Sequence, residues 1–157
     1  MERISAQDNS KSYVEKIETW FKNKNFSNVN LQVKQKPKND PQDSYIVAAE
    51  MTFEPSSSKM MKVEIWITNS GKMGIKMGSI GQEPDDVSIE AIIALLEIIS
   101  GGKIAESNSG FWIFKNKKLT LLESDCQKLS NLKYIYLDRF SKLKSFGKTV
   151  AKYDPWR

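Results

Sequence analysis

The chain has 157 residues, a net charge of +5 and a 27% share of charged residues, which together describe one globular domain of ordinary size. No apolar run reaches the ~20 residues that cross a bilayer, and the polar start MERISAQDNSKS lacks the apolar segment of a secretory signal. The single cysteine, Cys126, excludes an internal disulfide. We therefore expect one cytoplasmic domain over residues 1–157, without a membrane contact, whose ends at 1–9 and 153–157 are flexible.

The first half of the chain predicts a helix followed by an antiparallel meander. Apolar side chains recur at helical spacing over residues 10–24, on a face formed by Tyr13, Val14, Ile17, Trp20 and Phe21. Four segments then alternate apolar and polar residues, with polar turns between them: 29–34, 45–54, 60–68 and 72–78. Period-two segments with short connections indicate a four-stranded antiparallel sheet.

The segment DVSIEAIIALLEIISGG, residues 86–102, is apolar around most of its circumference when it is drawn as a helix. Asp86 or Ser88 can cap its start, and Gly101 and Gly102 end it. Because it is too short to cross a membrane and too apolar for a surface helix, we predict a buried central helix packed on the sheet.

Beyond this helix the pattern predicts short strands. They are expected near 103–106, at 111–115 and at 118–122. Turn residues separate them at 108–110 and 116–117.

A long C-terminal helix is predicted over about 125–145, where Ser124 and Gln127 form a capping box and Gly147 ends the helix. A short basic tail remains, which three apolar or aromatic residues can order: Val150, Tyr153 and Trp156. The predicted fold class is therefore α+β, in a single domain.

The residues that usually carry catalysis are sparse. The chain has no histidine, so the commonest general base and metal ligand is missing, and Cys126 has no histidine to activate it. The acids at 83–86 are explained by a helix N-terminus, whose dipole they complement, and match no calcium-loop spacing. We therefore predict a protein that is not an enzyme and that needs no cofactor or metal.

Gly147-Lys148-Thr149 resembles the end of a phosphate-binding loop, but its surroundings do not fit that motif. A P-loop has a glycine five residues before the last one, and this chain has Lys142 there. A P-loop also follows a strand, whereas this segment follows a predicted helix. The glycine is better explained as a helix end.

The outer face of the meander is the first candidate contact surface. If the odd residues of the strands face the core, then Lys62, Trp66 and Lys76 lie on the opposite face. A tryptophan on a half-polar sheet face is typical of a binding anchor. The alternative is that the 103–122 strands or the tail cover Trp66. Trp112 and Phe114 add bulky side chains that are either buried or meet another chain.

The C-terminal part is the second candidate surface, because residues 111–157 carry 11 Lys and Arg against 4 Asp and Glu. Lys144, Lys148 and Lys152 follow one another at helical spacing. A basic segment suits an acidic protein or phosphate backbones, and its simpler explanation is a solvated helix end. Lysine supplies 21 of the 24 cations, which favours loose attraction over specific base recognition.

The order of helix, meander, apolar helix, short strands and long helix resembles the small fold of type III secretion chaperones and YbjN-like proteins. This resemblance covers nearly the whole chain, rests on element order and length, and implies a homodimer that holds an extended partner segment. Such chaperones are usually acidic, whereas this chain has a pI near 9.2.

We therefore predict a small chaperone, immunity or adaptor protein that binds an acidic partner protein. We also expect this protein to form a homodimer. The predicted contact groups are those of the two candidate surfaces: Lys62, Trp66, Lys76, Trp112, Phe114, Lys144, Lys148 and Lys152. The alternative function is single-stranded nucleic-acid binding, with Trp66 stacking on bases and lysines holding phosphates.

Overall fold

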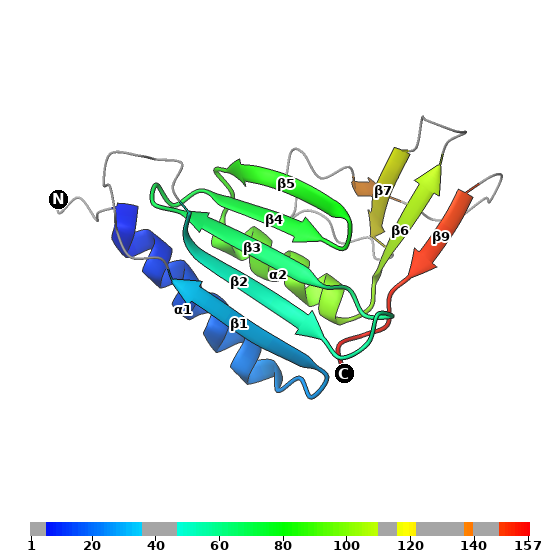
Figure 1. Ribbon diagram of the computed structural model, residues 1–157, viewed down its shortest axis with the longest axis horizontal. Helices are drawn as coiled ribbons and strands as arrows, with labels where there is room; N and C mark the ends of the chain where they lie inside the picture. The colour runs from blue at the N-terminus through cyan, green and yellow to red at the C-terminus, as the bar shows by residue number, and fades with distance from the viewer. Residues whose placement is uncertain (1–5, 36–46, 110–115, 122–136, 140–147) are drawn as a thin grey trace.

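The computed structural model describes residues 6–35, 47–109, 116–121, 137–139 and 148–157. These residues form an α+β fold with two helices and two sheets (Figure 1). The elements are, in chain order, α1 (Ala6–Lys24), β1 (Val29–Gln35), β2 (Val47–Pro55), β3 (Val63–Thr68), β4 (Met73–Met77), β5 (Ile80–Asp85), α2 (Ile89–Ser100), β6 (Ile104–Ser109), β7 (Asn116–Leu121), β8 (Leu137–Arg139) and β9 (Lys148–Lys152).

The first sheet is an antiparallel meander in the order β1-β2-β3-β4-β5. The predicted meander is confirmed, but it has a fifth strand that the sequence pattern missed. The reason is that β5 contains Gly81 and Pro84, which interrupt the alternation of apolar and polar residues. Gly78 adopts a φ of 59° in the turn before β5, a conformation that favours glycine.

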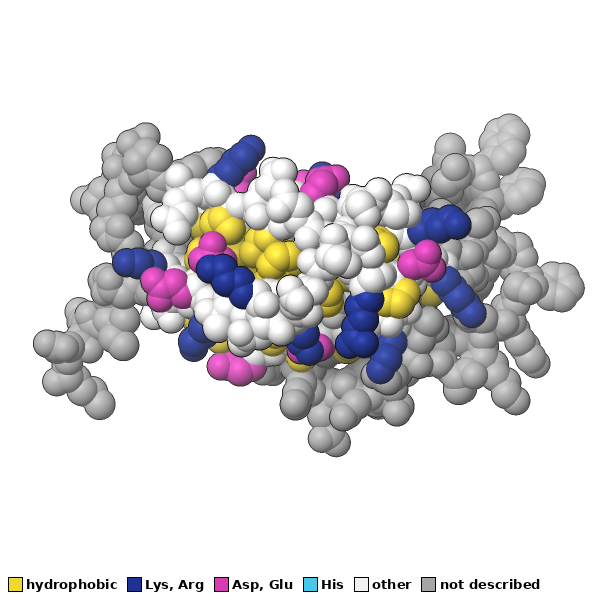
Figure 2. Space-filling view, turned by 90° about the horizontal axis from the view of Figure 1, so that it is seen from below, with side chains coloured by type: hydrophobic (Ala, Val, Ile, Leu, Met, Phe, Trp, Pro, Cys, Tyr) yellow, Lys and Arg dark blue, Asp and Glu magenta, His cyan; other side chains and the backbone are white. Residues whose placement is uncertain are grey.

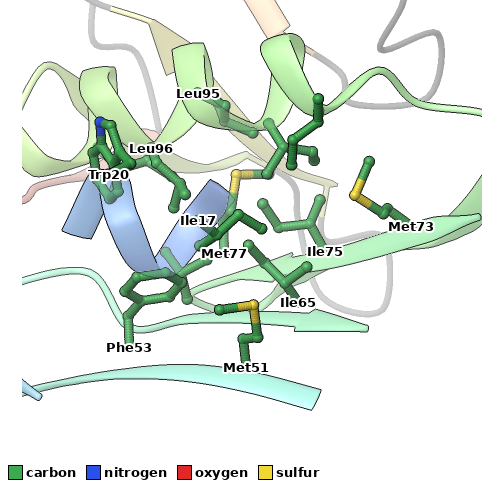
Figure 3. Close-up of a cluster of buried hydrophobic side chains, with 14 of the residues drawn as sticks. Ile17, Trp20, Met51, Phe53, Ile65, Met73, Ile75, Met77, Leu95 and Leu96 are labelled. Atoms are coloured by element: carbon green, nitrogen blue, oxygen red, sulfur yellow. The ribbon is translucent and has the colours of Figure 1, made fainter. Parts of the chain in front are cut away.

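Both helices lie on one face of this sheet, and the core fills the space between the two layers (Figure 3). The odd residues of β2, β3 and β4 point into this space, as the sequence predicted. Met51, Phe53, Ile65 and Met77 are completely buried there. Ile17 of α1 and the apolar side of α2 close the core from the helical layer.

The predicted boundaries of the two helices are close to those observed. The first helix begins earlier than predicted, at Ala6, so part of the segment expected to be flexible is helical. In α2 the side chain of Ser88 caps the N-terminus by accepting the backbone N–H of Ala91 at 3.2 Å. Gly102, at a φ of 69°, follows the C-terminus and allows Lys103 N–H to reach the carbonyl of Ile98 at 3.1 Å.

The second sheet has the order β8-β7-β6-β9 and corrects the prediction for the C-terminal part. The predicted turn at 116–117 is wrong, because both residues belong to β7 and continue its pairing with β6. The predicted helix over 125–145 is wrong at Leu137–Arg139, which pair in parallel with β7. Pairing between distant segments overrides helical periodicity at these positions. The rest of that helix, and the predicted strand at 111–115, lie outside the described residues.

Of the two expectations for the tail, a flexible end or an end ordered by its apolar and aromatic residues, the second holds at Trp156, which is completely buried. Its ring stacks on Phe53 with centroids 5.3 Å apart and meets Phe26 edge-on at 5.5 Å. Its indole N–H donates to the carbonyl of Met61 at 3.0 Å, and its backbone N–H donates to the carbonyl of Ser100 at 3.0 Å. A large buried aromatic side chain whose indole N–H has an acceptor, together with this backbone bond, fixes the tail in the core.

Candidate functional site

The outer face of the five-stranded sheet carries Trp66 at its centre. In the strand register Trp66 lies opposite Glu50 of β2 on one side and Gly74 of β4 on the other. Because Gly74 has no side chain, the indole has room beside it. Trp66 is half-buried, unlike its neighbours Ile65 and Ile67, which are completely buried on the core face. Both described helices lie behind the sheet, and no described element lies in front of this face (Figure 1).

The lysines of the outer face are paired with glutamates. Lys62 Nζ lies 2.9 Å from Glu54 Oε2 and 3.7 Å from Glu64 Oε1, and Lys76 Nζ lies 3.9 Å from Glu64 Oε2. The hydrogen bond to Glu54 raises the pKa of Lys62, against the effect of desolvation and with support from the charges of Glu54 and Glu64. The face is therefore close to neutral around Trp66, which disfavours an array of phosphates as its ligand.

Among the other predicted contact residues, Lys148 and Lys152 are placed on β9. They pair with Ser109 and Ala105 of β6, so these two lysines belong to a strand and not to a helix end, which their spacing in the sequence had suggested. Lys152 is exposed. Trp112, Phe114 and Lys144 lie outside the described residues.

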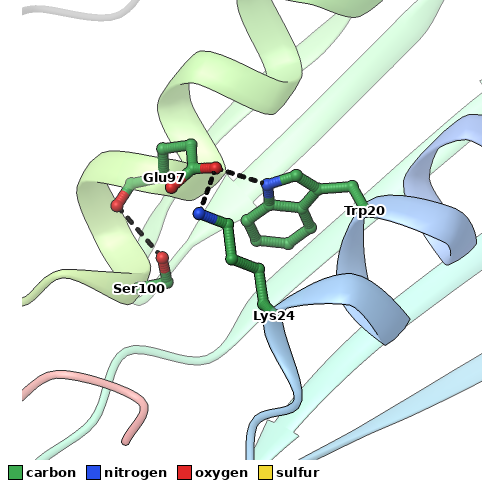
Figure 4. Close-up of polar contacts among 4 residues, drawn as sticks. All are labelled: Trp20, Lys24, Glu97 and Ser100. Atoms are coloured by element: carbon green, nitrogen blue, oxygen red, sulfur yellow. Dashed lines mark hydrogen bonds and ion pairs between the residues drawn. The ribbon is translucent and has the colours of Figure 1, made fainter.

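A polar cluster that sequence analysis missed joins the C-terminal halves of the two helices (Figure 4). Glu97 Oε1 accepts the indole N–H of Trp20 at 2.8 Å and lies 2.7 Å from Lys24 Nζ. Partial burial acts to raise the pKa of Glu97, but the hydrogen bonds from Lys24 and Trp20, together with the positive charges of Lys24 and Arg157, lower it below its ordinary value. Glu97 is therefore an anion at neutral pH.

A cavity of about 360 Å³ opens beside this cluster. It is lined by Lys24, Phe26, Glu97, Ser100, Gly101, Lys103, Pro155 and Arg157. Its volume lies at the lower end of the range for small-molecule sites. Lys24 stands in the last turn of α1, where it complements the helix dipole, and Arg157 acts on Glu97 through its charge, so structural roles explain both of these cations.

A second polar cluster connects the two sheets. Tyr153 donates its hydroxyl to Glu106 Oε2 at 2.6 Å, and the hydroxyl of Ser79 donates to the other oxygen of the same carboxylate. Burial, and then the hydrogen bond and charge of Glu106, raise the pKa of Tyr153. The phenol therefore stays protonated at neutral pH, where it serves as a hydrogen-bond donor rather than as a base.

Neither cluster was visible in the sequence, because its members come from segments far apart in the chain. Trp20 and Glu97 are 77 positions apart, and Glu106 and Tyr153 are 47 positions apart. The available signals were single residues: a tryptophan at the edge of the apolar stripe of α1, and a glutamate on an otherwise apolar helix.

The described residues contain no group of three or more His, Cys, Asp and Glu side chains arranged to hold a metal ion. The acids of the 83–86 segment are divided between the end of β5 and the exposed Asp86. No helix among the described residues is both long and apolar enough to cross a membrane. No protein-family model matches the chain, and comparisons with curated proteins and with solved structures find no significant match.

Proposed function

We propose that this protein is a binding module that recognises a partner protein through the outer face of its five-stranded sheet. The observation that carries this proposal is the position of Trp66, half-buried at the middle of the central strand. Tryptophan is enriched among the residues that dominate binding energy at protein interfaces. A module of this kind acts as a small chaperone, immunity or adaptor protein.

The charges around Trp66 favour a protein partner over a nucleic acid. Lys62 and Lys76 each lie within ion-pair distance of a glutamate on the same face. Lys34 of β1 lies opposite Glu50 of β2 in the strand register. Alternating charges around an aromatic centre resemble the polar rim of a protein interface, whereas a single-stranded nucleic acid requires a continuous basic track.

The basic C-terminal part supplies a second, weaker attraction. Residues 111–157 carry 11 cations against 4 anions, and Lys152 of β9 is exposed. Such an excess raises the rate at which an acidic partner associates, more than it raises the affinity of the final complex. We therefore propose an acidic partner whose apolar contact is with Trp66.

The test is affinity capture from native lysate by the purified protein, with and without nuclease, followed by binding measurements with the purified captured protein. Trp66→Ala is expected to weaken that binding by about 30-fold, as for a residue worth ~2 kcal/mol at an interface. Thr52→Ala is the matched control, because Thr52 is half-buried on the same face one strand away. We expect its effect to be small.

Two outcomes would contradict the proposal. Capture that disappears on nuclease treatment would show that nucleic acid, and not protein, is the ligand. Equal affinity of the Trp66→Ala variant and the wild-type protein would show that the outer face is not the contact surface. Circular dichroism of both variants must first show the wild-type fold.

A further inference from the structure

The first strand of the meander forms an edge of the sheet. Among the described residues β1 pairs with β2 alone, and Figure 1 shows it as the outermost strand on its side. The pairing with β2 is regular over all seven residues of β1, without a bulge. A straight edge strand presents unpaired backbone groups in the plane of the sheet and can accept a further strand.

One backbone hydrogen bond shows which residues of β1 point toward this free edge. The N–H of Ser56 donates to the carbonyl of Asn28 at 2.8 Å, in the register that the β1–β2 pairing continues. Because the bonding direction alternates along an antiparallel strand, the even residues of β1 bond to β2. The odd residues therefore direct their N–H and C=O groups outward: Val29, Leu31, Val33 and Gln35.

The apolar side of this edge is incompletely covered. Leu31 and Val33 belong to the core face but are only half-buried, whereas Phe53, the partner of Leu31 on β2, is completely buried. The ring centroid of Phe21 in α1 lies 5.6 Å from that of Phe53, and Phe21 is also half-buried. Figure 2, which views the molecule from the side of α1 and β1, shows hydrophobic side chains gathered near the middle of this face.

The opposite edge of the same sheet, formed by β5, is protected against pairing with a further strand, unlike the β1 edge. The β5 strand contains Pro84, pairs irregularly with β4, and lies against β7 of the second sheet. Proline, irregular pairing and covering elements are the devices by which proteins prevent a sheet edge from pairing further. On β1 the one charged residue is Lys34, near the end of the strand.

We propose that the β1 edge pairs in antiparallel fashion with β1 of a second copy of the chain. The register that pairs all seven residues is centred on Gln32, which then faces its own copy across the two-fold axis. It places Leu31 opposite Val33 on the core face and Asn30 opposite Lys34 on the outer face. No like charges oppose each other, and the bonded pairs fall on the odd residues, whose backbone groups point outward.

The resulting dimer joins the two meanders into one sheet and covers the half-buried side chains of Leu31, Val33 and Phe21. Self-complementarity at one surface is what a two-fold interface requires. The contact uses the edge of the sheet and leaves the outer face around Trp66 open. It is therefore separate from the proposed recognition of a partner protein, and Trp66→Ala should not change the mass of the dimer.

The first experiment measures the mass of the purified protein by light scattering during size-exclusion chromatography, over a wide range of concentration. The expected species at high concentration has twice the chain mass of 17.9 kDa. Val33→Pro removes an outward N–H without removing a bond to β2, and proline is tolerated at such edge positions. It should abolish the dimer, whereas Val33→Ala, which keeps the N–H, should only weaken it.

The second experiment tests the register, in a Cys126→Ser background. Residues that face each other in a non-bonded antiparallel pair have Cα atoms about 4.5 Å apart, within the range for a disulfide. Gln32→Cys should therefore form an intermolecular disulfide under mild oxidation. Asn30→Cys is the control, because the two copies of residue 30 would be roughly 13 Å apart in this register.

A protein that stays monomeric at every concentration overturns the proposal. A dimer that persists in a folded Val33→Pro variant, and in which Gln32→Cys does not form the disulfide, also overturns it, because the contact must then lie elsewhere. If Val33→Pro does not fold, the comparison of the two cysteine variants decides alone.

Discussion

The indole N–H of Trp20 donates to the carboxylate of Glu97 at 2.8 Å, and this bond connects α1 to α2 (Figure 4). The same carboxylate oxygen lies 2.7 Å from Lys24 Nζ, so one acceptor serves two donors of α1. Both helices also contribute apolar side chains to the core between the helical layer and the sheet. Glu97 therefore forms a polar link between the C-terminal halves of the two helices.

Replacing Glu97 by alanine should lower stability because it leaves the largely buried indole N–H of Trp20 without its acceptor. The expected loss is about 1 kcal/mol of unfolding free energy, the usual value for a hydrogen bond of this kind. Glu97→Gln keeps an acceptor oxygen and should lose less. Urea denaturation of the three proteins measures the difference. Identical midpoints for the alanine variant and the wild-type protein would show that water replaces the carboxylate at no cost.

The charge of Glu97 should also make stability depend on pH. Its pKa in the folded protein is lowered from the ordinary 4.5, so the ionised form stabilises the fold above that pH. This contribution is lost as the pH falls through the lowered pKa. Because the side chain is 42% exposed, solvent screening keeps the effect below ~1 kcal/mol.

The measurement is the difference in melting temperature between the wild-type protein and Glu97→Gln, at neutral pH and at pH values below 4.5. The advantage of the wild-type protein should shrink as the solution becomes acidic, and also when salt is added at neutral pH. An advantage that grows toward acid pH would contradict the assignment of Glu97 as the stabilising anion.

Trp156 should be among the most destabilising positions to truncate, although it is the second-last residue. It is completely buried and stacks on Phe53, so Trp156→Ala should cost about 3–5 kcal/mol by thermal or chemical unfolding. Arg157→Ala changes the exposed neighbour and should have little effect. Equal stability of the two variants would show that the tail is not part of the core.

Trp156→Phe separates packing from hydrogen bonding at this position. Phenylalanine retains an aromatic ring against Phe53 but leaves the buried carbonyl of Met61 without its donor. We expect an intermediate loss, about 1–3 kcal/mol from the unpaired carbonyl together with a smaller packing defect. A stability close to that of the alanine variant would indicate that the ring fits only as tryptophan.

The parts of the fold that sequence analysis predicted are those set by local periodicity. The alternation around Met51, Ile65 and Ile75 is period two, and the buried stripe that includes Ile17 is helical, so each pattern identifies its element without knowledge of the rest of the chain. The outward orientation of Trp66 followed from the same alternation. These predictions are confirmed.

The parts that sequence analysis missed depend on contacts between distant segments. Residues 137–139 carry a helical pattern, yet they pair with β7, and no local signal specifies that partner. The sequence identified Trp156 as a residue that can order the tail, but its partners Phe26, Phe53 and Met61 could not be predicted from the local pattern. The contact between Tyr153 and Glu106 likewise exists only after the two sheets are assembled.

Gly102 should not tolerate a side chain, because two independent constraints require glycine at this position. Its φ of 69° is one that side chains rarely adopt, and a Cβ atom would lie 2.8 Å from the backbone nitrogen of Pro155. A backbone atom cannot move aside as the end of a flexible side chain can. Gly102→Ala should therefore displace the tail that carries Trp156 and cost about 1–3 kcal/mol.

Gly81→Ala is the matched control, since its added Cβ would meet nothing closer than 3.9 Å and its φ is not positive. This variant should be as stable as the wild-type protein, or slightly more stable, because alanine restricts the unfolded chain. Thermal unfolding of the two variants, with Trp fluorescence as a second probe for the environment of Trp156, compares them directly. If Gly102→Ala and Gly81→Ala have the same melting temperature, the tail must be able to shift away from α2 without a loss of stability. In that case Trp156 cannot be the residue that fixes the tail.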